Sequence, residues 1–428
     1  MMTAAKTLPP ESSSDVSVAR LEDLEPGNFF PLWLGSETLR QNALDGLVAS
    51  WGSRRPFYIR QNGILSLMCG RARDIREVYL DPERFSVVPP RRPGYEMFDM
   101  FGGLESVLQM DGPRHSRVRR LMNPSFTPAS LRNMAADIDR IVDEKLDRIE
   151  ANGPQFDAVG DFSADLVQRI MLEGSFRLTS AHCDAFSAML AEMGKLPSYT
   201  AGEPIPQSFY DAGAAVREVI DDIIRLRRDD PGDDLISHLI AAREQGDKLS
   251  DAELFGQINS IATAGIGTTA NTLAGALMLL ARNRDALEAV RQDPAKLDGA
   301  IGECLRWHGP GIVAFVRFCT RDTEIGGTRI PADMPVYVSA QAAGFDPEEV
   351  SDPFRFDITR DNRRTLVFGT GPHHCIGQRL ARQILRSALG RFIARFPDYR
   401  LVDVEFRPHY HGLTGELSPA SIPMTTCQ

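Results

Sequence analysis

The chain has 428 residues, of which 43% are hydrophobic and 25% are charged, a balance typical of a folded protein with a large buried core. Its formal net charge of −10 argues against nucleic acid as the main partner. The six cysteines form no C-x-x-C pair, and the first residues lack the charged and then apolar pattern of a secretion signal. We therefore expect a cytoplasmic protein that is not inserted in a membrane.

The domain organisation is expected to be simple. The interior of the chain has no Pro-, Gly- or Ser-rich linker, so residues 21–428 are predicted to form a single domain. Residues 1–20 are polar and contain a run of serines, which predicts a flexible leader. We expect the protein to be a monomer.

The N-terminal part of the chain predicts one helix followed by a small sheet. The helix is expected over residues 36–51, and two short strands over residues 56–59 and 65–68 are joined by a tight turn at residues 62–63. Residues 85–107 are irregular and apolar. A long loop of this kind is either disordered or functional.

Helical periodicity dominates the middle of the chain, over residues 114–307. The longest helix is predicted over residues 251–283. Short strands are expected again over residues 313–318, 323–330 and 336–339. The chain should therefore be mainly α-helical with a minor β portion.

The predicted helix over residues 251–283 is apolar nearly all round, as expected of a helix buried through the centre of a protein. A membrane span is the alternative, but the glutamine, asparagine, serine and threonine side chains along it argue against exposure to lipid. Its middle reads Ala264, Gly265, isoleucine, Gly267 and Thr268. Because each glycine costs about 1 kcal/mol relative to alanine in a helix, we expect a local opening here, with the threonine hydroxyl turned toward a ligand.

A loop punctuated by glycines surrounds Cys375 and precedes a second apolar pattern at helical spacing. Cys375 is therefore expected at a helix N-terminus, where free N–H groups and the helix dipole favour a thiolate. Glycines let backbone amides approach a large flat ligand. These features fit a thiolate ligand to iron, held by a loop that contains Phe368, Gly369, Gly371 and Gly377.

Other interpretations of Cys375 are open at this point. A lone cysteine is usually a small buried hydrophobic residue, and a cysteine at a helix start can also be an activated nucleophile. Structural zinc needs several Cys or His ligands at short spacing, and the nearest other cysteine, Cys319, is remote in the sequence. The cysteine spacing argues against zinc, and the loop alone does not decide between an iron ligand and a nucleophile.

Taken together, these motifs resemble the cytochrome P450 family, the haem-thiolate monooxygenases, in their soluble bacterial form. Phe368, Gly371, Cys375 and Gly377 match the family signature F-x-x-G-x-x-x-C-x-G. The resemblance spans nearly the whole chain. It implies the cytochrome P450 fold, with a long central helix over a buried haem b whose axial ligand is the thiolate of Cys375.

The resemblance also implies a role for Glu303 and Arg306. They lie three residues apart on a predicted helix and can pair, but most such pairs are weak surface contacts. In the family this E-x-x-R pair locks the core near the haem. We therefore assign both residues a structural role.

Two haem carboxylates buried beside the porphyrin need cationic or hydrogen-bonding partners. His115 and Arg119 match the H-x-x-x-R pattern of the helix that binds them in the family. Arg317, on an expected strand, and His373, two residues before the cysteine, match the other usual contacts. The remaining cofactor contacts implied by the resemblance are Ala264 and Gly265 of the central helix.

One departure from the family concerns Thr268. The residue before this threonine is usually an acid that supplies protons, but here it is Gly267, and we assign both positions to catalysis. An ordered water, a polar group of the substrate or another acid such as Glu416 could supply the path. The alternative is that glycine makes room for a bulky substrate.

The resemblance implies a monooxygenase that inserts one atom of dioxygen into a small to medium hydrophobic substrate, by hydroxylation, epoxidation or O-dealkylation. Fungal nitric oxide reductases of the same family also lack the acid, and peroxide-using members need no proton relay, so both are alternatives. A non-enzymatic haem sensor ranks below them. The substrate pocket is expected to be apolar and to include Phe98, Phe101, Ile312, Val313 and Phe315.

Arginines are concentrated around the cysteine loop and over residues 114–120. If these regions adjoin, they form a basic face on an acidic protein, to which a small acidic partner can be steered. In the family this partner is a ferredoxin served by its reductase, and we place its docking near Arg379 and Arg382. The alternative is that these arginines belong to ordinary solvated helix faces.

Overall fold

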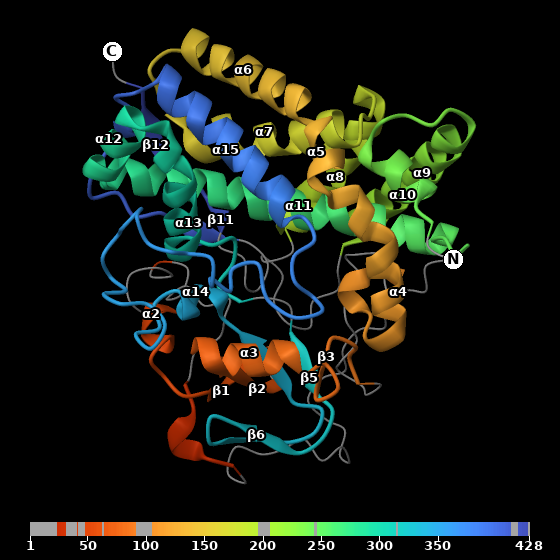
Figure 1. Ribbon diagram of the computed structural model, residues 1–428, viewed down its shortest axis with the longest axis vertical. Coiled ribbons are helices and arrows are strands. Elements are labelled where there is room, and N and C mark those ends of the chain that lie inside the picture. The colour runs from red at the N-terminus through yellow and green to blue at the C-terminus, as the bar shows by residue number, and fades with distance from the viewer. Residues whose placement is uncertain are drawn as a thin grey trace.

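The computed structural model describes residues 24–30, 41, 48–61, 64–90, 105–195, 206–243, 246–313, 316–411 and 418–426. In Figure 1, long helices make up the upper part of the molecule and a small sheet lies in the lower part. The protein is mainly α-helical with a minor β portion, which confirms the predicted fold class.

The lower part is built on a five-stranded sheet. In spatial order its strands are β1 (Phe57–Gln61), β2 (Ile64–Cys69), β8 (Pro335–Val338), β5 (Arg317–Cys319) and β3 (Phe85–Ser86). The strands β2 and β8 run parallel, and the other neighbours pair antiparallel. The helix α3 (Ala72–Leu80) lies against the sheet (Figure 1), and its Ile75 and Val78 are buried together with apolar side chains of the strands.

The longest helix, α11 (Asp251–Arg282), crosses the helical part of the molecule. The Ser250 side chain accepts a hydrogen bond from the Glu253 N–H, and the Glu253 carboxylate accepts one from the Ser250 N–H, so a capping box starts the helix. By length and composition α11 could cross a membrane, yet 78% of its most apolar window is buried inside the protein. It is therefore a core helix, as the sequence predicts.

The helices packed directly on α11 include α7 (Ala164–Arg169), α9 (Gln207–Asp229), α13 (Leu297–Trp307) and α15 (Gln378–Arg395). The last of these follows the cysteine loop and also runs beside α6 (Ala135–Asn152). A ladder of ion pairs joins the two helices: Arg391 contacts Asp143 at 2.7 Å, and Arg395 contacts Asp147 at 2.9 Å. The helix behind the cysteine is thus anchored on two sides.

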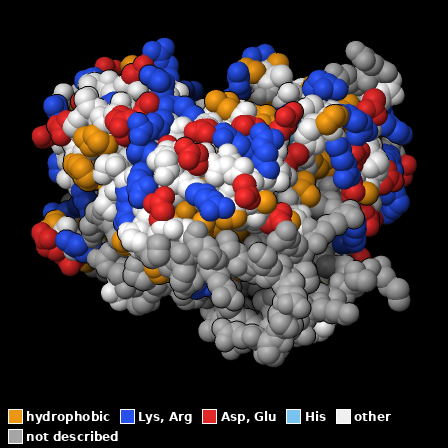
Figure 2. Space-filling model, turned by 90° about the horizontal axis from the view of Figure 1, so that it is seen from below, with side chains coloured by type: hydrophobic (Ala, Val, Ile, Leu, Met, Phe, Trp, Pro, Cys, Tyr) orange, Lys and Arg blue, Asp and Glu red, His pale blue; other side chains and the backbone are white. Residues whose placement is uncertain are grey.

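Shorter elements complete the fold. The remaining α-helices are α2 (Val48–Trp51), α4 (Gly112–Met122), α5 (Pro128–Arg132), α8 (Ser180–Lys195), α10 (Leu235–Ala241), α12 (Arg284–Gln292) and α14 (Ala340–Ala343). The remaining strands are β4 (Gln155–Asp157), β6 (Thr323–Ile325), β7 (Thr328–Ile330), β9 (Arg400–Leu401), β10 (Tyr410–His411), β11 (Ser418–Pro419) and β12 (Pro423–Thr425). In Figure 2, side chains of both charges are interspersed over the described surface, with hydrophobic side chains scattered among them.

Some predicted elements need correction. The strand β3 lies at the start of the stretch that was expected to be irregular, and β4 interrupts the region that was expected to be helical, because each completes a sheet with partners remote in the sequence. The strand expected over residues 323–330 is a hairpin, β6 and β7, that turns at Gly326-Gly327. The leader over residues 1–20 and the turn at residues 62–63 lie outside the described residues, as does most of the predicted helix over residues 36–51.

Candidate functional site

The cysteine loop is folded back on itself by backbone hydrogen bonds. The Cys375 N–H donates to the Phe368 carbonyl at 2.9 Å, and the His374 N–H donates to the Gly371 carbonyl at 3.1 Å. Gly369 and Gly371 have φ of 69° and 73°, in the left-handed region that glycine adopts without strain. A Cβ on Gly371 would lie 2.6 Å from the Tyr79 carbonyl oxygen, so this glycine serves the packing of the loop on α3, which the sequence did not indicate.

Cys375 lies three residues before the first residue of α15, which begins at Gln378, so it precedes the helix rather than standing at its first turn. Its side chain is accessible. Burial within the surrounding protein raises the pKa of the thiol, whereas the N–H groups of Gly377 and Gln378 and the charge of Arg119 act to lower it. Because burial prevails, the chain alone does not favour the thiolate, contrary to the expectation from the sequence. A coordinated metal ion would have to remove the thiol proton.

Four histidine and arginine side chains from three separate segments converge near the loop. His115 and Arg119 come from α4, Arg317 from β5 and His373 from the cysteine loop itself. The rings of His115 and His373 lie 4.2 Å apart between centroids, and Arg119 Nη2 donates to the His374 carbonyl at 2.6 Å. The fold therefore brings together the four residues that the sequence assigned to the haem carboxylates.

The charge state of this cluster is set mainly by burial, to which repulsion between its members adds. Burial, together with the neighbouring His373 and Arg119, lowers the pKa of His115 to about 4. Burial also lowers the pKa of Arg317, whose side chain is 5% exposed and lies 5.4 Å above the Tyr79 ring. His115 Nε2 is buried and makes no hydrogen bond to the described residues. Two arginines beside a buried ring nitrogen that has no hydrogen-bond partner among the described residues are suited to an anionic ligand.

Asp111 is a further candidate, which the sequence pattern does not single out. Its Oδ1 lies 3.2 Å from His373 Nε2, and its Oδ2 accepts hydrogen bonds from Ser86 Oγ at 2.6 Å and from the Val87 N–H at 2.9 Å. Burial acts to raise the pKa of Asp111, but the hydrogen bonds from His373, Ser86 and Val87 outweigh it and hold the pKa below its usual value. An aspartate directly before a Gly-Pro helix start predicts only a local cap.

The central helix differs from the sequence-based expectation. It is continuous through Gly265 and Gly267, and the Thr268 hydroxyl donates to the Ala264 carbonyl at 2.6 Å. The predicted opening is therefore not present in the helix backbone, because the threonine side chain is bonded to its own helix. A Cβ added to Gly267 would meet no described atom within 4 Å, whereas one on Gly265 would lie 3.2 Å from Met171 Cε.

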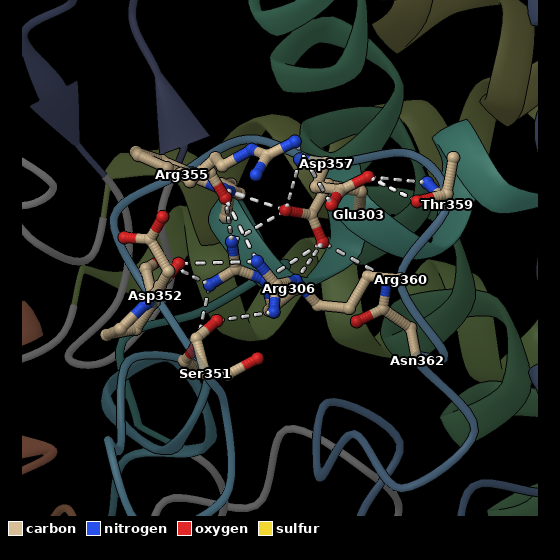
Figure 3. Close-up of polar contacts among 12 residues, drawn as sticks. Glu303, Arg306, Ser351, Asp352, Arg355, Asp357, Thr359, Arg360 and Asn362 are labelled. Atoms are coloured by element: carbon tan, nitrogen blue, oxygen red, sulfur yellow. Dashed lines mark hydrogen bonds and ion pairs between the residues drawn. The ribbon is translucent and has the colours of Figure 1, made fainter.

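Glu303 and Arg306 form a buried pair on α13. Arg306 Nη2 lies 2.6 Å from Glu303 Oε1, and the two side chains are 2% and 0% exposed. Figure 3 shows the pair surrounded by the chain over residues 351–362. Glu303 accepts hydrogen bonds from the Asp357 N–H at 2.9 Å and from Asn362 Nδ2 at 3.1 Å.

The arginine of this pair is satisfied by the same segment and by α14. Arg306 Nη1 donates to the carbonyls of Gly344 and Pro353 at 2.7 and 2.8 Å. Burial acts to raise the pKa of Glu303, but Arg306 and the hydrogen-bond donors hold it below its usual value. The pair is thus a charged clamp that joins α13 to the segment leading to the cysteine loop, not a surface contact.

A thiol-bearing loop, a cluster of histidines and arginines beside it, a buried Glu–Arg clamp and a long core helix occur together in one known family. Residues 55–407 of this chain match the family model described as Cytochrome P450. The chain belongs to the cytochrome P450 family.

Individual relatives agree with this assignment. Cytochrome P450 107B1 of Saccharopolyspora erythraea is 32% identical over 355 residues, which cover 79% of this chain and 84% of that protein. The steroid C26-monooxygenase of Mycobacterium tuberculosis is 31% identical over 350 residues, covering 82% and 91%. The structure of cytochrome P450 CYP109Q5 from Chondromyces apiculatus superposes with a TM-score of 0.80 at 25% identity, covering 92% and 98%. This chain is a bacterial-type P450 monooxygenase, an oxidoreductase.

Only part of the expected substrate pocket of this P450 lies among the described residues. Phe98, Phe101 and Phe315, together with the candidate acid Glu416, lie outside the described residues. Ile312 is 5% exposed and packs in a hydrophobic cluster with side chains of α2, β1 and β2, against which Val313 is partly buried. Packing in that cluster accounts for Ile312, so its placement gives no separate support to a pocket role.

A hollow of about 620 Å³ lies beside the cysteine loop of this P450. Its lining includes five arginines, namely Arg76, Arg360, Arg363, Arg364 and Arg382. Arg363 is paired with Asp361 at 2.7 Å, whereas the Arg382 guanidinium lies 5.3 Å above the Phe368 ring. Arg379, on the first turn of α15, is exposed. The lining also includes Asp298 and Asp361, and Arg379 is not part of it.

Proposed function

We propose that this P450 binds haem b with Cys375 as its axial ligand and inserts one atom of dioxygen into a small to medium hydrophobic substrate. The observation that carries the proposal is the position of the accessible thiol beside four converging histidine and arginine side chains. When bound, the haem supplies the oxygen-activating chemistry, to which a thiolate ligand contributes electron density. Hydroxylation, epoxidation and O-dealkylation all follow from that chemistry. We propose a single catalytic domain over residues 21–428, acting as a cytoplasmic monomer.

The residues present fit a haem. The porphyrin is an apolar plane with two carboxylates, and the cluster offers His115 Nε2, which is buried without a hydrogen-bond partner among the described residues. Arg119 and Arg317 would neutralise the carboxylates and His373 would be a hydrogen-bonding partner, and the anions would oppose the burial and repulsion that lower the pKa of His115. The thiol at Cys375 would be the ligand, with the N–H groups of Gly377 and Gln378 directed at its sulfur. The backbone around Phe368, Gly369 and Gly371, together with Ala264 and Gly265, would frame the porphyrin.

Two residues on α11 would affect proton delivery and the room available for the substrate. The Thr268 hydroxyl donates a hydrogen bond to the Ala264 carbonyl, and it would have to exchange that bond before it could donate to any other group. Gly267 cannot supply an acid. The open space beside Gly267 supports the view that this position makes room, and proton supply would then fall to water, to a substrate group or to Glu416. Glu303 and Arg306 would hold α13 against the segment that leads to the cysteine loop.

The proposed substrate is defined by its chemical class, a hydrophobic organic molecule. A relative of this chain is named as a steroid C26-monooxygenase, which supports a hydrophobic substrate. Electrons would come from a ferredoxin and its reductase, docked on the basic side of the cysteine loop near Arg379 and Arg382. The arginine-lined hollow supports an acidic partner at this place.

The decisive experiment is the absorption spectrum of the reduced, carbon monoxide-bound protein. We expect a thiolate-type Soret band from the wild type and its loss in Cys375→Ser, with a band typical of a neutral ligand instead. A wild type without this band, or Cys375→Ser with it, would overturn the haem-thiolate assignment. Product formation is then measured with a ferredoxin, its reductase and substrates chosen by the shift they cause in the ferric spectrum.

The absence of an acid at Gly267 favours a second candidate. A nitric oxide reductase or a peroxide-dependent oxygenase of this family would not need the acid for proton delivery from solvent. Turnover of nitric oxide with a reduced nicotinamide, or of substrate with hydrogen peroxide, in the absence of ferredoxin would favour these reactions. Turnover that requires both dioxygen and ferredoxin would favour the monooxygenase.

A further inference from the structure

Asp111 joins three segments that are far apart in the chain. It precedes α4, the helix that carries His115 and Arg119, and it reaches His373, which is 262 residues away in the sequence. Its second oxygen is held by Ser86 and Val87, at the end of the edge strand β3. The side chains of His373 and Asp111 are 11% and 19% exposed, so this junction is largely shielded from water.

The carboxylate of Asp111 is diverted from its expected local role. Asp111 is the N-cap residue of α4, a position at which aspartate commonly accepts a hydrogen bond from the helix N-terminus. Here its side chain makes no such cap. It accepts two hydrogen bonds from the strand segment, which fix its orientation, and this leaves Oδ1 directed at the histidine.

Two contacts therefore fix the orientation of the His373 ring. Its Nε2 is engaged by Asp111 at 3.2 Å, and its ring lies against the His115 ring at 4.2 Å between centroids. Since a carboxylate accepts and does not donate, Nε2 carries a proton in this contact. Nδ1 is the ring nitrogen left for a second partner, and it donates to another carboxylate only when it carries a proton as well. Histidines that ligate metal ions are commonly fixed through their other ring nitrogen in the same way.

We propose that Asp111 is a positioning residue for haem retention, acting through His373: the carboxylate holds the imidazole by its Nε2–H, so that a protonated Nδ1 can donate to a haem carboxylate. This inference rests on the proposed function. It assigns Ser86 and Val87 a supporting role, since their hydrogen bonds hold the Asp111 carboxylate in place. It also accounts for a negative charge inside a cluster of histidines and arginines.

The test uses the haem-bound protein and measures the rate of haem transfer to excess apomyoglobin. We expect Asp111→Asn to accelerate haem loss about tenfold, by analogy with the lower end of the effect of residues that orient the ligands of a metal ion. Asp247→Asn is the matched control, because Asp247 also loses one charge and also contacts α4, through Arg117 at 2.6 Å. The control should release haem at the wild-type rate.

A double-mutant cycle separates positioning from a general structural role. If Asp111 acts through His373, then Asp111→Asn adds little to His373→Ala, and the double variant loses haem at about the rate of His373→Ala alone. Two independent effects that multiply would show that Asp111 merely ties the strand to α4, and would overturn the proposal. The reduction potential of the haem, measured in the same four proteins, should show the same non-additivity.

Two further outcomes are decisive. If Asp111→Asn does not fold, Ser86→Ala replaces it: it removes one hydrogen bond from the carboxylate and should accelerate haem loss about twofold, whereas a wild-type rate would overturn the proposal. The carbon monoxide spectrum of the wild type is recorded first. Absence of the thiolate band would overturn the proposed function and this inference with it, whereas a normal band with unchanged haem loss in Asp111→Asn would overturn the positioning role alone.

Discussion

The hydroxyl of Thr268 donates a hydrogen bond to the carbonyl oxygen of Ala264, one turn earlier in α11, at 2.6 Å. This bond satisfies the side chain within its own helix, so any part that Thr268 takes in proton transfer requires the bond to be exchanged. The residue beside it, Gly267, offers no acid and is surrounded by open space. Substitutions at Gly267 can therefore show whether this position takes part in proton delivery beside Thr268.

We expect Gly267→Asp and Gly267→Glu to raise the fraction of reductant that ends in product and to lower hydrogen peroxide release. A Cβ here meets no described atom within 4 Å, and a carboxyl group beside Thr268 can supply protons. Gly267→Ala is the control, since it adds the Cβ without the acid. Coupling that is equal in all three variants and the wild type would show that this position takes no part in proton delivery.

Glu303→Gln should destabilise the protein by about 3–5 kcal/mol, because it leaves the buried Arg306 guanidinium without its counter-charge. Urea unfolding at pH 7 measures this difference. Glu288→Gln is the control: its exposed pair with Arg291 should contribute less than about 1 kcal/mol. Equal effects of the two substitutions would contradict a structural clamp at Glu303.

The same pair predicts a dependence on pH. The pKa of Glu303 is lower in the folded protein than its ordinary value, so its contribution to stability is present above the unfolded pKa of about 4.3. That contribution is lost as the pH falls through the lower, folded pKa. The gap in unfolding free energy between wild type and Glu303→Gln should therefore narrow below about pH 4.3, and a gap that widens on acidification would contradict the assignment.

Gly371→Ala should destabilise the protein by about 1–3 kcal/mol, because its φ of 73° strains an L side chain and its Cβ would lie 2.6 Å from the Tyr79 carbonyl oxygen. Gly377→Ala is the matched control, since a Cβ there meets no described atom within 4 Å. Thermal unfolding of the haem-free and haem-bound proteins checks both. Gly377→Ala should weaken haem retention without destabilising the haem-free protein if this glycine makes room for the porphyrin.

Local sequence patterns predicted the site where its members are close in the chain. The periodicity behind Cys375 indicated α15, and the apolar pattern with an uncharged middle indicated α11 as a core helix. The start of α15 was misplaced relative to Cys375, because Ile376 continues the apolar pattern while Gly377 is still outside the helix. The thiol pKa was misjudged for a related reason: burial, which a sequence does not display, outweighs the N–H groups near the sulfur.

Local sequence patterns cannot predict contacts between segments that are remote in the chain. Asp111 and His373 are 262 residues apart, and nothing in the residues around Asp111 distinguishes a long-range partner from a helix cap. Glu303 and Arg306 could be paired from their spacing, but their burial comes from the segment over residues 351–362, which folds over them (Figure 3). The family resemblance supplied the grouping of the four histidine and arginine residues, and the fold brings those residues together.

Charge reversal on the basic side of the cysteine loop is the last prediction. Arg379→Glu and Arg382→Glu should each raise the KM for ferredoxin about 3- to 10-fold at low salt, with kcat at saturating ferredoxin little changed, because surface charge pairs contribute up to about 1 kcal/mol. The difference from wild type should shrink as salt rises, since the screening length falls to about 8 Å at 0.15 M. Arg148→Glu is the control: Arg148 is exposed on α6, which pairs with α15 near Arg395, at the far end of that helix from Arg379. An equal rise in KM in the control would indicate a response to net charge rather than docking beside the cysteine loop, and unchanged KM in both variants would place the partner elsewhere.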